Sequence, residues 1–195
     1  MNSVAICTYN GEKYIKDQLI SIMNQTMLPD EIVICDDCSE DNTVNIINDT
    51  LKNWSRDWNL IINKENLGFK KNFQKAIGLC KGDIIYLSDQ DDIWNLKKME
   101  IMSRVFKDYP DAVMTFHDAI LVNGQLQVLY PSFWHILKFD SKMFKLNSYS
   151  CLFKSNVLQG SACAFKKGVF LKAYPFPQEA ILKWFTCQDK KSAIF

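Results

Sequence analysis

The segment "DIIYLSDQDDIW", residues 83–94, places an apolar run directly before a cluster of carboxylates. The run has the continuous apolar character of a strand that is buried on both faces of a sheet. Asp89, Asp91 and Asp92 follow it closely, with Gln90 between the first two. Like charges this close repel one another, and a carboxylate beside an apolar strand is costly unless something compensates it. The segment therefore predicts a divalent cation bound at the end of a central strand.

Short apolar runs alternate with helical patterns through the first 110 residues. Each run resembles a strand, and apolar side chains at helical spacing follow it. Such alternation indicates repeated βαβ units and a mostly parallel sheet. We expect Ser39 or Asp41 to cap the second helix. The predicted strands cover residues 4–7, 31–35, 59–63 and 83–88, and the predicted helices cover 13–24, 44–51, 69–80 and 99–106.

The alternation of strand and helix patterns ends at Pro110. Residues 112–116 and 120–128 have the pattern of strands, and the Asn123-Gly124 pair predicts a hairpin turn within the second stretch. Residues 130–158 are rich in aromatic side chains and show neither the helical nor the strand spacing of apolar residues. The predicted fold class is α/β, with a Rossmann-like, mostly parallel central sheet flanked by helices and a smaller mixed C-terminal part.

Length and charge bound the class of protein. A chain of 195 residues suits one domain, which we expect to consist of a half at 1–110 and a second half at 111–195. The 23 basic and 22 acidic residues nearly cancel, so the chain lacks the basic surplus that binds nucleic acid. We therefore expect no nucleic-acid partner.

The cysteines and the hydropathy pattern predict a cellular location. Seven cysteines are scattered through the periodic segments, and Cys35 and Cys38 have a CxxC spacing. Because no second pair at zinc spacing follows and the motif does not open a helix, free buried thiols in a reducing compartment are the favoured interpretation. No stretch reaches the length of a membrane span, and no signal peptide opens the chain. We expect a soluble cytoplasmic protein.

Polar residues gather where the predicted strands end. In an open α/β sheet these ends meet at one edge, where ligands bind. The first end lies close to a helix N-terminus and the third offers Lys70, Lys71 and a glycine, so both suit phosphate. The second end offers Asp36 and Asp37 to a base or ribose, although turn and capping chemistry is an alternative for this pair. The four segments are "TYNGE", "DDCSEDN", "NLGFKKN" and "SDQDD", and together they predict a site for a metal-bound nucleoside diphosphate.

With these segments in order, the chain resembles family 2 glycosyltransferases of the GT-A fold, over roughly residues 3–177. The matching pieces are "VAICTYNGEKYIKDQLISIMNQT", "PDEIVICDDCSEDNT", "NLGFKKNFQKAI" and "GDIIYLSDQDDIW". The "DQDDIW" form is similar to rhamnosyltransferase-like members that build bacterial surface polysaccharides. The resemblance implies a metal-dependent, inverting transfer of a sugar from a nucleoside-diphosphate donor, with residues 1–110 binding the donor and 111–195 forming part of the acceptor side.

The resemblance also implies roles for individual residues. Asp89-Gln90-Asp91 matches the DXD motif, in which Asp91 would be the direct ligand of Mn²⁺ or Mg²⁺ and Asp89 would face the ribose or the metal. Asp37 would accept a hydrogen bond from the base, usually uracil or thymine, and Asp118 would contact donor or acceptor. The remaining positions expected along the donor are Thr8, Tyr9, Asn10, Glu12, Gly68 and the Lys71-Asn72 region. The implied partners are a UDP- or dTDP-linked sugar and a saccharide or lipid-linked acceptor, the latter allowing peripheral association with the inner face of a membrane.

The match to the family weakens near the C-terminus. The "GSACAF" segment at 160–165 fits, but the acidic motif that normally supplies the general base is absent after it. Glu179 and Asp189 are the nearby carboxylates and are weak candidates for this role. The expected C-terminal helices are also missing, so we expect a truncated chain. Its catalytic residues stay unknown at this point.

Two alternatives follow from these residues. The first is a catalytically impaired protein that binds the donor but lacks a general base. The second is a Mg²⁺-binding receiver-type regulatory module, although its acidic pair would follow the first strand, which here ends in Thr8 and Tyr9. A dinucleotide oxidoreductase would require GxGxxG after that strand, and this motif is absent.

Overall fold

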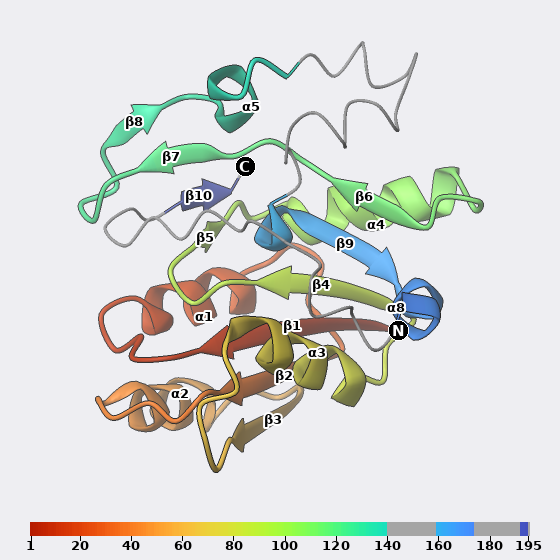
Figure 1. The fold of residues 1–195 in the computed structure, drawn as a ribbon. Helices are drawn as coiled ribbons and strands as arrows, with labels where there is room; N and C mark the ends of the chain where they lie inside the picture. Colours follow the sequence, from red (N-terminus) through yellow and green to blue (C-terminus); the bar gives the residue numbers. More distant parts are fainter. Residues whose placement is uncertain (140–158, 174–191, 195) are drawn as a thin grey trace.

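The computed structural model describes residues 1–139, 159–173 and 192–194, and its centre is a six-stranded sheet with the order β3-β2-β1-β4-β9-β6 (Figure 1). The first four of these strands in the chain run parallel to one another. β9 is antiparallel to β4, and β6 is antiparallel to β9. The strands are β1 (Asn2–Thr8), β2 (Glu31–Asp36), β3 (Asp57–Ile62), β4 (Ile84–Ser88), β6 (Met114–Phe116) and β9 (Cys163–Lys166).

The four longer helices alternate with the parallel strands, as the sequence predicts. The N-cap of the second helix is Asn42, whose side chain makes no capping hydrogen bond, so neither Ser39 nor Asp41 occupies the predicted position. Asp41, one residue earlier, accepts from the Thr43 amide at 3.0 Å, whereas the Ser39 hydroxyl donates to Asp36. These helices are α1 (Ile15–Met23), α2 (Thr43–Leu51), α3 (Phe69–Leu79) and α4 (Lys98–Asp108). The described residues contain three shorter helical segments after these: α5 (Phe133–Ile136), η1 (Gly160–Ala162) and α8 (Lys167–Ala173).

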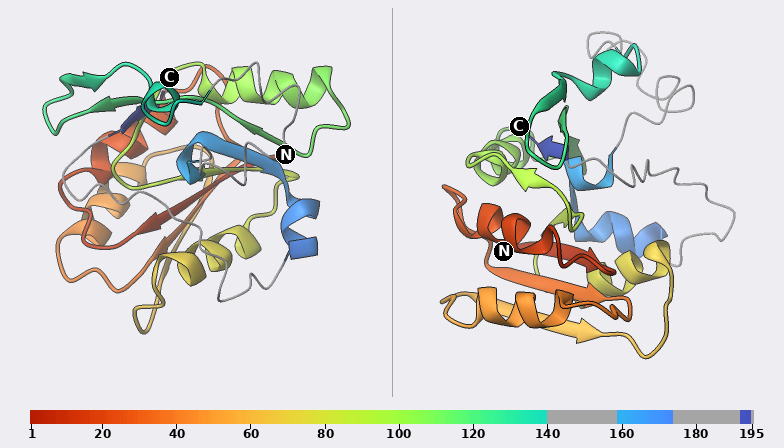
Figure 2. Two further views of the ribbon diagram at one scale, coloured as in Figure 1. Left: turned by 45° about the horizontal axis from the view of Figure 1, so that its top comes forward. Right: turned by 90° about the vertical axis from the view of Figure 1, so that its left-hand side faces the viewer.

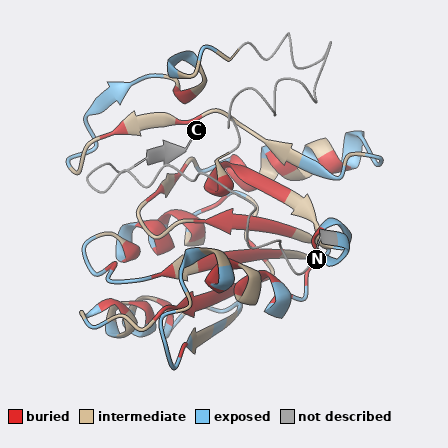
Figure 3. Ribbon diagram, viewed as in Figure 1, coloured by how far each residue is buried: buried red, intermediate tan, exposed pale blue. Residues whose placement is uncertain are grey.

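Helices cover both faces of the sheet (Figure 2). On one face, α1, α2 and α4 pack on side chains such as Val4 and Ile6. On the other face, α3 and α8 pack on Ala5 and its neighbours. Successive strand residues thus point to opposite faces, and every residue of β2 is buried (Figure 3). The prediction of parallel strands buried on both faces is confirmed.

A second, smaller sheet has the strand order β5-β10-β7-β8. The predicted hairpin exists, because β7 (Ile120–Val122) pairs antiparallel with β8 (Val128–Tyr130). The connection that contains Asn123 and Gly124 is longer than a tight turn, however. Asn123 Oδ1 accepts hydrogen bonds from two later amides of a longer loop, in which the positive φ falls on Leu126. The other strands of this sheet are β5 (Ile93–Trp94) and β10 (Ser192–Ile194).

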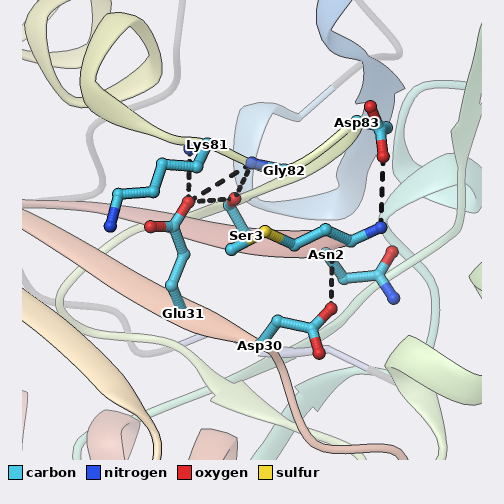
Figure 4. Close-up of polar contacts among 8 residues, drawn as sticks. Asn2, Ser3, Asp30, Glu31, Lys81, Gly82 and Asp83 are labelled. Carbon is cyan, nitrogen blue, oxygen red and sulfur yellow. Dashed lines mark hydrogen bonds and ion pairs between the residues drawn. The ribbon is translucent and has the colours of Figure 1, made fainter.

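A buried carboxylate joins three segments at the amino ends of the parallel strands (Figure 4). Glu31 Oε1 accepts a hydrogen bond from the Ser3 hydroxyl at 2.5 Å, from the Lys81 amide, and from the Gly82 amide at 3.3 Å. A Cβ atom at Gly82 would lie 2.8 Å from the Ser3 nitrogen, so only glycine fits this approach. Glu31 therefore fixes the turn between α3 and β4.

Replacing Glu31 by alanine should destabilise the fold by about 2 kcal/mol, because the Lys81 amide and the Ser3 hydroxyl would lose their acceptor, whereas the Gly82 amide keeps Ser3 Oγ at 2.8 Å. Urea unfolding followed by circular dichroism measures this change. Glu31→Gln keeps an acceptor oxygen and should lose less than half as much. Equal stability of the alanine variant and the wild type would contradict the role given to this carboxylate.

Candidate active site

The carboxyl ends of the parallel strands form one edge of the central sheet. Thr8 at the end of β1 is level with Asp36 at the end of β2. Ser88 at the end of β4 pairs with Ile6 on the other side of β1. The chain proceeds from β1 outward to β3 and then returns to place β4 beside β1, so the strand order reverses between β1 and β4. Ligands of open α/β sheets bind outside the strand ends at such a switch point.

The loop after β1 is fastened by its main chain. The amide of Tyr9 donates to Gln90 Oε1 at 2.8 Å, and that of Asn10 donates to Ser39 Oγ at 2.9 Å. The next two amides donate to side chains at the start of α2: Gly11 to Thr43 Oγ1 at 2.7 Å and Glu12 to Asp41 Oδ2 at 3.0 Å. These four consecutive N–H groups already have acceptors, and α1 begins only at Ile15. These amides therefore serve the loop itself, and a contact of this strand end with phosphate stays a prediction.

Most side chains of this loop also hold the protein together. Thr8 is buried and its hydroxyl donates to Asp36 Oδ2 at 2.7 Å. The side chains of Asn10 and Glu12 accept hydrogen bonds from amides of the loop after β2, at 2.8 and 3.0 Å. Tyr9 differs, because 48% of its surface is exposed. Its ring is the surface that this loop offers to a ligand.

The two carboxylates after β2 have different surroundings. Asp36 accepts from Thr8, and from the amide and hydroxyl of Ser39, which is turn chemistry. Asp37 accepts from Asn63 Nδ2 and the Leu67 amide, both at 2.8 Å, and from the Gly68 amide at 2.9 Å. Asp37 thus shapes the loop before α3, and its two oxygens keep capacity for one more donor.

The start of α3 lies next to Asp37 at the same edge of the sheet. Gly68 precedes the helix with a φ of 76°, a conformation that favours glycine. Lys71 is exposed in the first turn. Asn72 is buried; its amide donates to the Cys35 carbonyl at 2.8 Å and accepts from Asn63 at 2.9 Å. Lys71 is therefore available to a ligand, whereas Asn72 is structural.

The acidic segment after β4 is partly buried, and Asp92 is 2% exposed. Burial, together with the nearby charge of Asp91, raises the pKa of Asp89 to about 7. Burial also raises the pKa of Asp92 well above its usual value, with Asp89 and Asp91 adding to the effect. The Ser161 side chain acts in the opposite direction on both pKa values. Carboxylates this crowded fit a bound cation.

A buried lysine behind these carboxylates was not found from the sequence. Lys98 opens α4 and is 3% exposed. Its Nζ donates to the Ser161 carbonyl at 2.5 Å and lies 3.8 Å from the centre of the Trp94 ring. Burial lowers the pKa of Lys98 to about 7, while Asp92 raises it again. Its position four residues before buried Met102, on the same helix face, was the available signal.

The residues after β6 serve the fold. Asp118 accepts from the Ala119 and Trp134 amides and from the Ser132 hydroxyl, and so holds the start of α5. His117 Nδ1 lies 2.6 Å from the Asp118 carbonyl oxygen, and its Nε2 is buried without a hydrogen-bond partner among the described residues. Burial, with a contribution from Lys98, lowers the pKa of His117 to about 3. The Asp118 carboxylate is thus already engaged.

Other expectations can be compared with the described part of the chain. Cys7, Cys35, Cys38, Cys80 and Cys163 are free thiols, and burial raises the pKa of each. Among the described helices, none has the length and apolar character needed to cross a membrane. The weak general-base candidates, Glu179 and Asp189, lie outside the described residues.

The described residues contain no group of three or more His, Cys, Asp or Glu side chains placed to hold a metal ion by themselves. The acidic segment nevertheless fits a cation whose coordination is completed by a substrate. Mg²⁺ and related ions are commonly bound by one or two carboxylates, and oxygens of a substrate diphosphate complete the coordination. Asp89 and Asp91 are the carboxylates that would hold such an ion.

Solved structures with this architecture are GT-A glycosyltransferases, which confirms the predicted fold. The mannosyltransferase PcManGT from Pyrobaculum calidifontis, in complex with GDP-Man and Mn²⁺, is similar with a TM-score of 0.65 and 18% identity, over 91% of this chain and 48% of that one. S. aureus TarS 1–349 in complex with UDP-GlcNAc is similar with a TM-score of 0.52 and 25% identity, over 63% of this chain and 33% of that one.

The sequence comparison names the family. The model of Glycosyl transferase family 2 matches residues 3–172, so the chain belongs to this family. The dTDP-rhamnosyl transferase RfbG of Shigella flexneri is 36% identical over 132 residues, which are 65% of this chain and 43% of that protein. The chondroitin synthase of Escherichia coli is 33% identical over 54% of this chain and 15% of that protein. The chain thus spans less than half the length of these relatives.

Proposed function

We propose that this chain binds a UDP- or dTDP-linked sugar with a divalent cation and transfers the sugar, with inversion, to a saccharide or lipid-linked acceptor. The observation that carries the proposal is the acidic segment, Asp89 to Asp92, at the switch point beside a loop whose amides are already engaged. A nucleoside diphosphate needs positive charge at its phosphates. With these four amides occupied, a cation at Asp89 and Asp91 is the main source of that charge.

The residues at the carboxyl ends of the parallel strands each have a role in this proposal. The exposed ring of Tyr9 stacks on the base, and the remaining capacity of Asp37 accepts its N–H group. Gly68 allows the ribose to approach the backbone, and Lys71 lies near the diphosphate. Thr8, Asn10 and Glu12 act indirectly by holding the loops. A divalent cation, Mn²⁺ or Mg²⁺, would neutralise the charge that develops on the departing nucleoside diphosphate.

Inversion requires a base that deprotonates the acceptor hydroxyl on the face opposite the leaving group. Within the described residues, Asp118 is occupied by α5 and His117 is too weakly basic. Glu179 and Asp189 therefore stay the candidates for this base. If neither serves, the protein binds the donor without transferring the sugar, and an assay of donor hydrolysis and transfer separates these two cases.

Several finer assignments rest on the relatives. RfbG is named a dTDP-rhamnosyl transferase, and TarS was solved with UDP-GlcNAc, which supports UDP or dTDP as the carrier. The Mn²⁺ in PcManGT supports the choice of metal. We place the donor half at 1–110, part of the acceptor side at 111–195, and the protein in the cytoplasm, at the inner face of the membrane when the acceptor is lipid-linked.

The receiver-type alternative is not supported by the strand order. Receiver modules have five parallel strands in the order 2-1-3-4-5. The sheet here has β1 between β2 and β4, and it continues into two strands, β9 and β6, that receiver modules lack.

Calorimetric titration of UDP and dTDP, each with and without Mn²⁺, tests the proposed function. We expect binding that Mn²⁺ strengthens by at least about tenfold, because the cation neutralises the diphosphate charge. ADP is the matched control and should bind more weakly, since its base is not a pyrimidine. A folded protein that binds neither pyrimidine nucleotide would overturn the proposal.

A further inference from the structure

The side chain of Gln90 reaches from the acidic segment to the loop after β1. Its Oε1 accepts a hydrogen bond from the Tyr9 amide at 2.8 Å, and its Nε2 donates to the Tyr9 carbonyl at 3.1 Å. Both main-chain groups of one residue are therefore bound by one side-chain amide. This pairing resembles the exchange of two hydrogen bonds between neighbouring strands, across the gap where β1 and β4 have ended.

The shape of the loop is adapted to this contact. A Cβ atom on Gly11 would lie 2.7 Å from Gln90 Cδ and closer still to Oε1. A side chain at this position would therefore displace the amide from Tyr9. Gly11 thus leaves the space in which the Gln90 amide makes its two hydrogen bonds.

The chemistry of the contact requires an amide of this length. Glutamate could accept from the Tyr9 amide, but its second oxygen would face the Tyr9 carbonyl and repel it. Methionine could fill the same volume but would form neither hydrogen bond. Gln90 also lies between Asp89 and Asp91, whose carboxylates are the proposed cation ligands. One residue thus has its main chain in the cation segment and its side chain on the loop that carries the exposed Tyr9 ring.

We propose that Gln90 is a positioning residue that couples the two halves of the donor site. Ordering of the acidic segment by a cation is transmitted through the Gln90 amide to Tyr9, which then presents its ring to the base. Conversely, a nucleotide held on Tyr9 favours the arrangement of Asp89 and Asp91 that binds the cation, as reciprocal coupling requires. Both statements rest on the cation of the proposed function, but only the role in donor binding also requires the nucleotide.

Hydrogen exchange of the Tyr9 amide, followed by NMR in the absence of nucleotide, tests this link. Mg²⁺ is used in place of Mn²⁺, which is paramagnetic and broadens NMR signals. In the wild type, adding Mg²⁺ should slow the exchange of the Tyr9 amide. In Gln90→Ala, the amide should exchange about tenfold faster than in the wild type, the effect of one lost hydrogen bond, and Mg²⁺ should no longer change its rate. Gln125→Ala, on the exposed β7–β8 loop, is the matched control and should behave as the wild type.

A pair of variants then separates positioning from a general loss of structure. Gln90→Ala and Gln90→Glu should both weaken UDP binding by about tenfold. The glutamate variant adds a negative charge beside Asp89 and Asp91, so its affinity for Mn²⁺ alone, measured from the paramagnetic resonance of free Mn²⁺, should be unchanged or higher. A residue with only a structural role would lower both affinities together.

The outcomes of these experiments distinguish failure of the coupling from failure of the proposed function. Exchange at Tyr9 that is equal in Gln90→Ala and the wild type overturns the coupling, as does UDP affinity unchanged in both variants. Parallel loss of UDP and Mn²⁺ affinity in Gln90→Glu also overturns it. If the wild type binds no nucleotide while Mg²⁺ still slows the exchange through Gln90, the proposed function fails and the link between cation and loop stands.

Discussion

Asp91→Asn is expected to lose the Mn²⁺-dependent part of UDP binding, a decrease in affinity of about 100-fold, or about 2.7 kcal/mol. Asparagine keeps the shape of the side chain but removes the charge that would hold the cation beside Asp89. The contacts proposed for the base and ribose at Tyr9 and Asp37 would stay in place. UDP should therefore bind the variant and the wild type with equal affinity when Mn²⁺ is absent.

Calorimetric titration of both proteins, with and without Mn²⁺, provides the four affinities needed for this comparison. Asp111→Asn, an exposed carboxylate remote from the acidic segment, is the control and should keep the full Mn²⁺ effect. The assignment of Asp91 as the ligand is contradicted if Mn²⁺ strengthens UDP binding by the same factor in the variant and the wild type.

Lys98→Met should lower the free energy of unfolding by about 3 kcal/mol, because removing one member of a buried set of charges leaves the others uncompensated. Lys98 is 3% exposed and donates to the Ser161 carbonyl, and the charges of Asp92 and Asp89 raise its pKa against the effect of burial. Methionine has a similar volume, so the loss arises from charge more than from packing.

Urea unfolding of Lys98→Met and of the control Lys97→Met, at an exposed neighbouring position, measures this loss. The double variant Lys98→Met/Asp92→Asn removes the charge left behind and should recover part of the stability. The pKa of Asp92 is already raised in the fold, and the loss of Lys98 raises it further, so the folded variant binds a proton that the unfolded chain releases. Its deficit should therefore shrink as the pH falls from 8 to 6. A deficit equal to that of Lys97→Met, at either pH, would contradict this role.

The central fold could be predicted because its signals are local. The all-apolar character of "EIVIC" and the helical spacing after each strand follow from burial on a parallel sheet, and the structure has these elements within a few residues of their predicted bounds. β5 has only two residues, too few for a period to be visible, and the sequence analysis missed it. The hairpin around Asn123 and Gly124 was predictable, but its longer loop was not, because the Asn123 side chain and a positive φ at Leu126 set its geometry.

The meeting of the candidate site segments at one edge of the sheet was predictable, whereas their hydrogen bonds were not. The carboxyl ends of the parallel strands had to meet, so the segments around Tyr9, Asp37 and Asp91 could be assigned to one edge. The engagement of the amides from Tyr9 to Glu12 depends on side chains about 30 and 80 residues away, which no local pattern indicates. Lys98 was missed because its charge suggested a solvent-facing position.

If the chain binds a nucleotide as proposed, the four hydrogen-bonded amides of the loop after β1 limit how its base preference could be changed. The path of this loop is set by Ser39, Thr43 and Asp41, which are themselves parts of the connection that leads into α2. Substitutions intended to reroute the loop would therefore disturb that connection as well. Redesign of base preference should leave the loop backbone alone and vary only the Tyr9 ring, whose exposed face can be exchanged without altering any of the contacts that hold the loop.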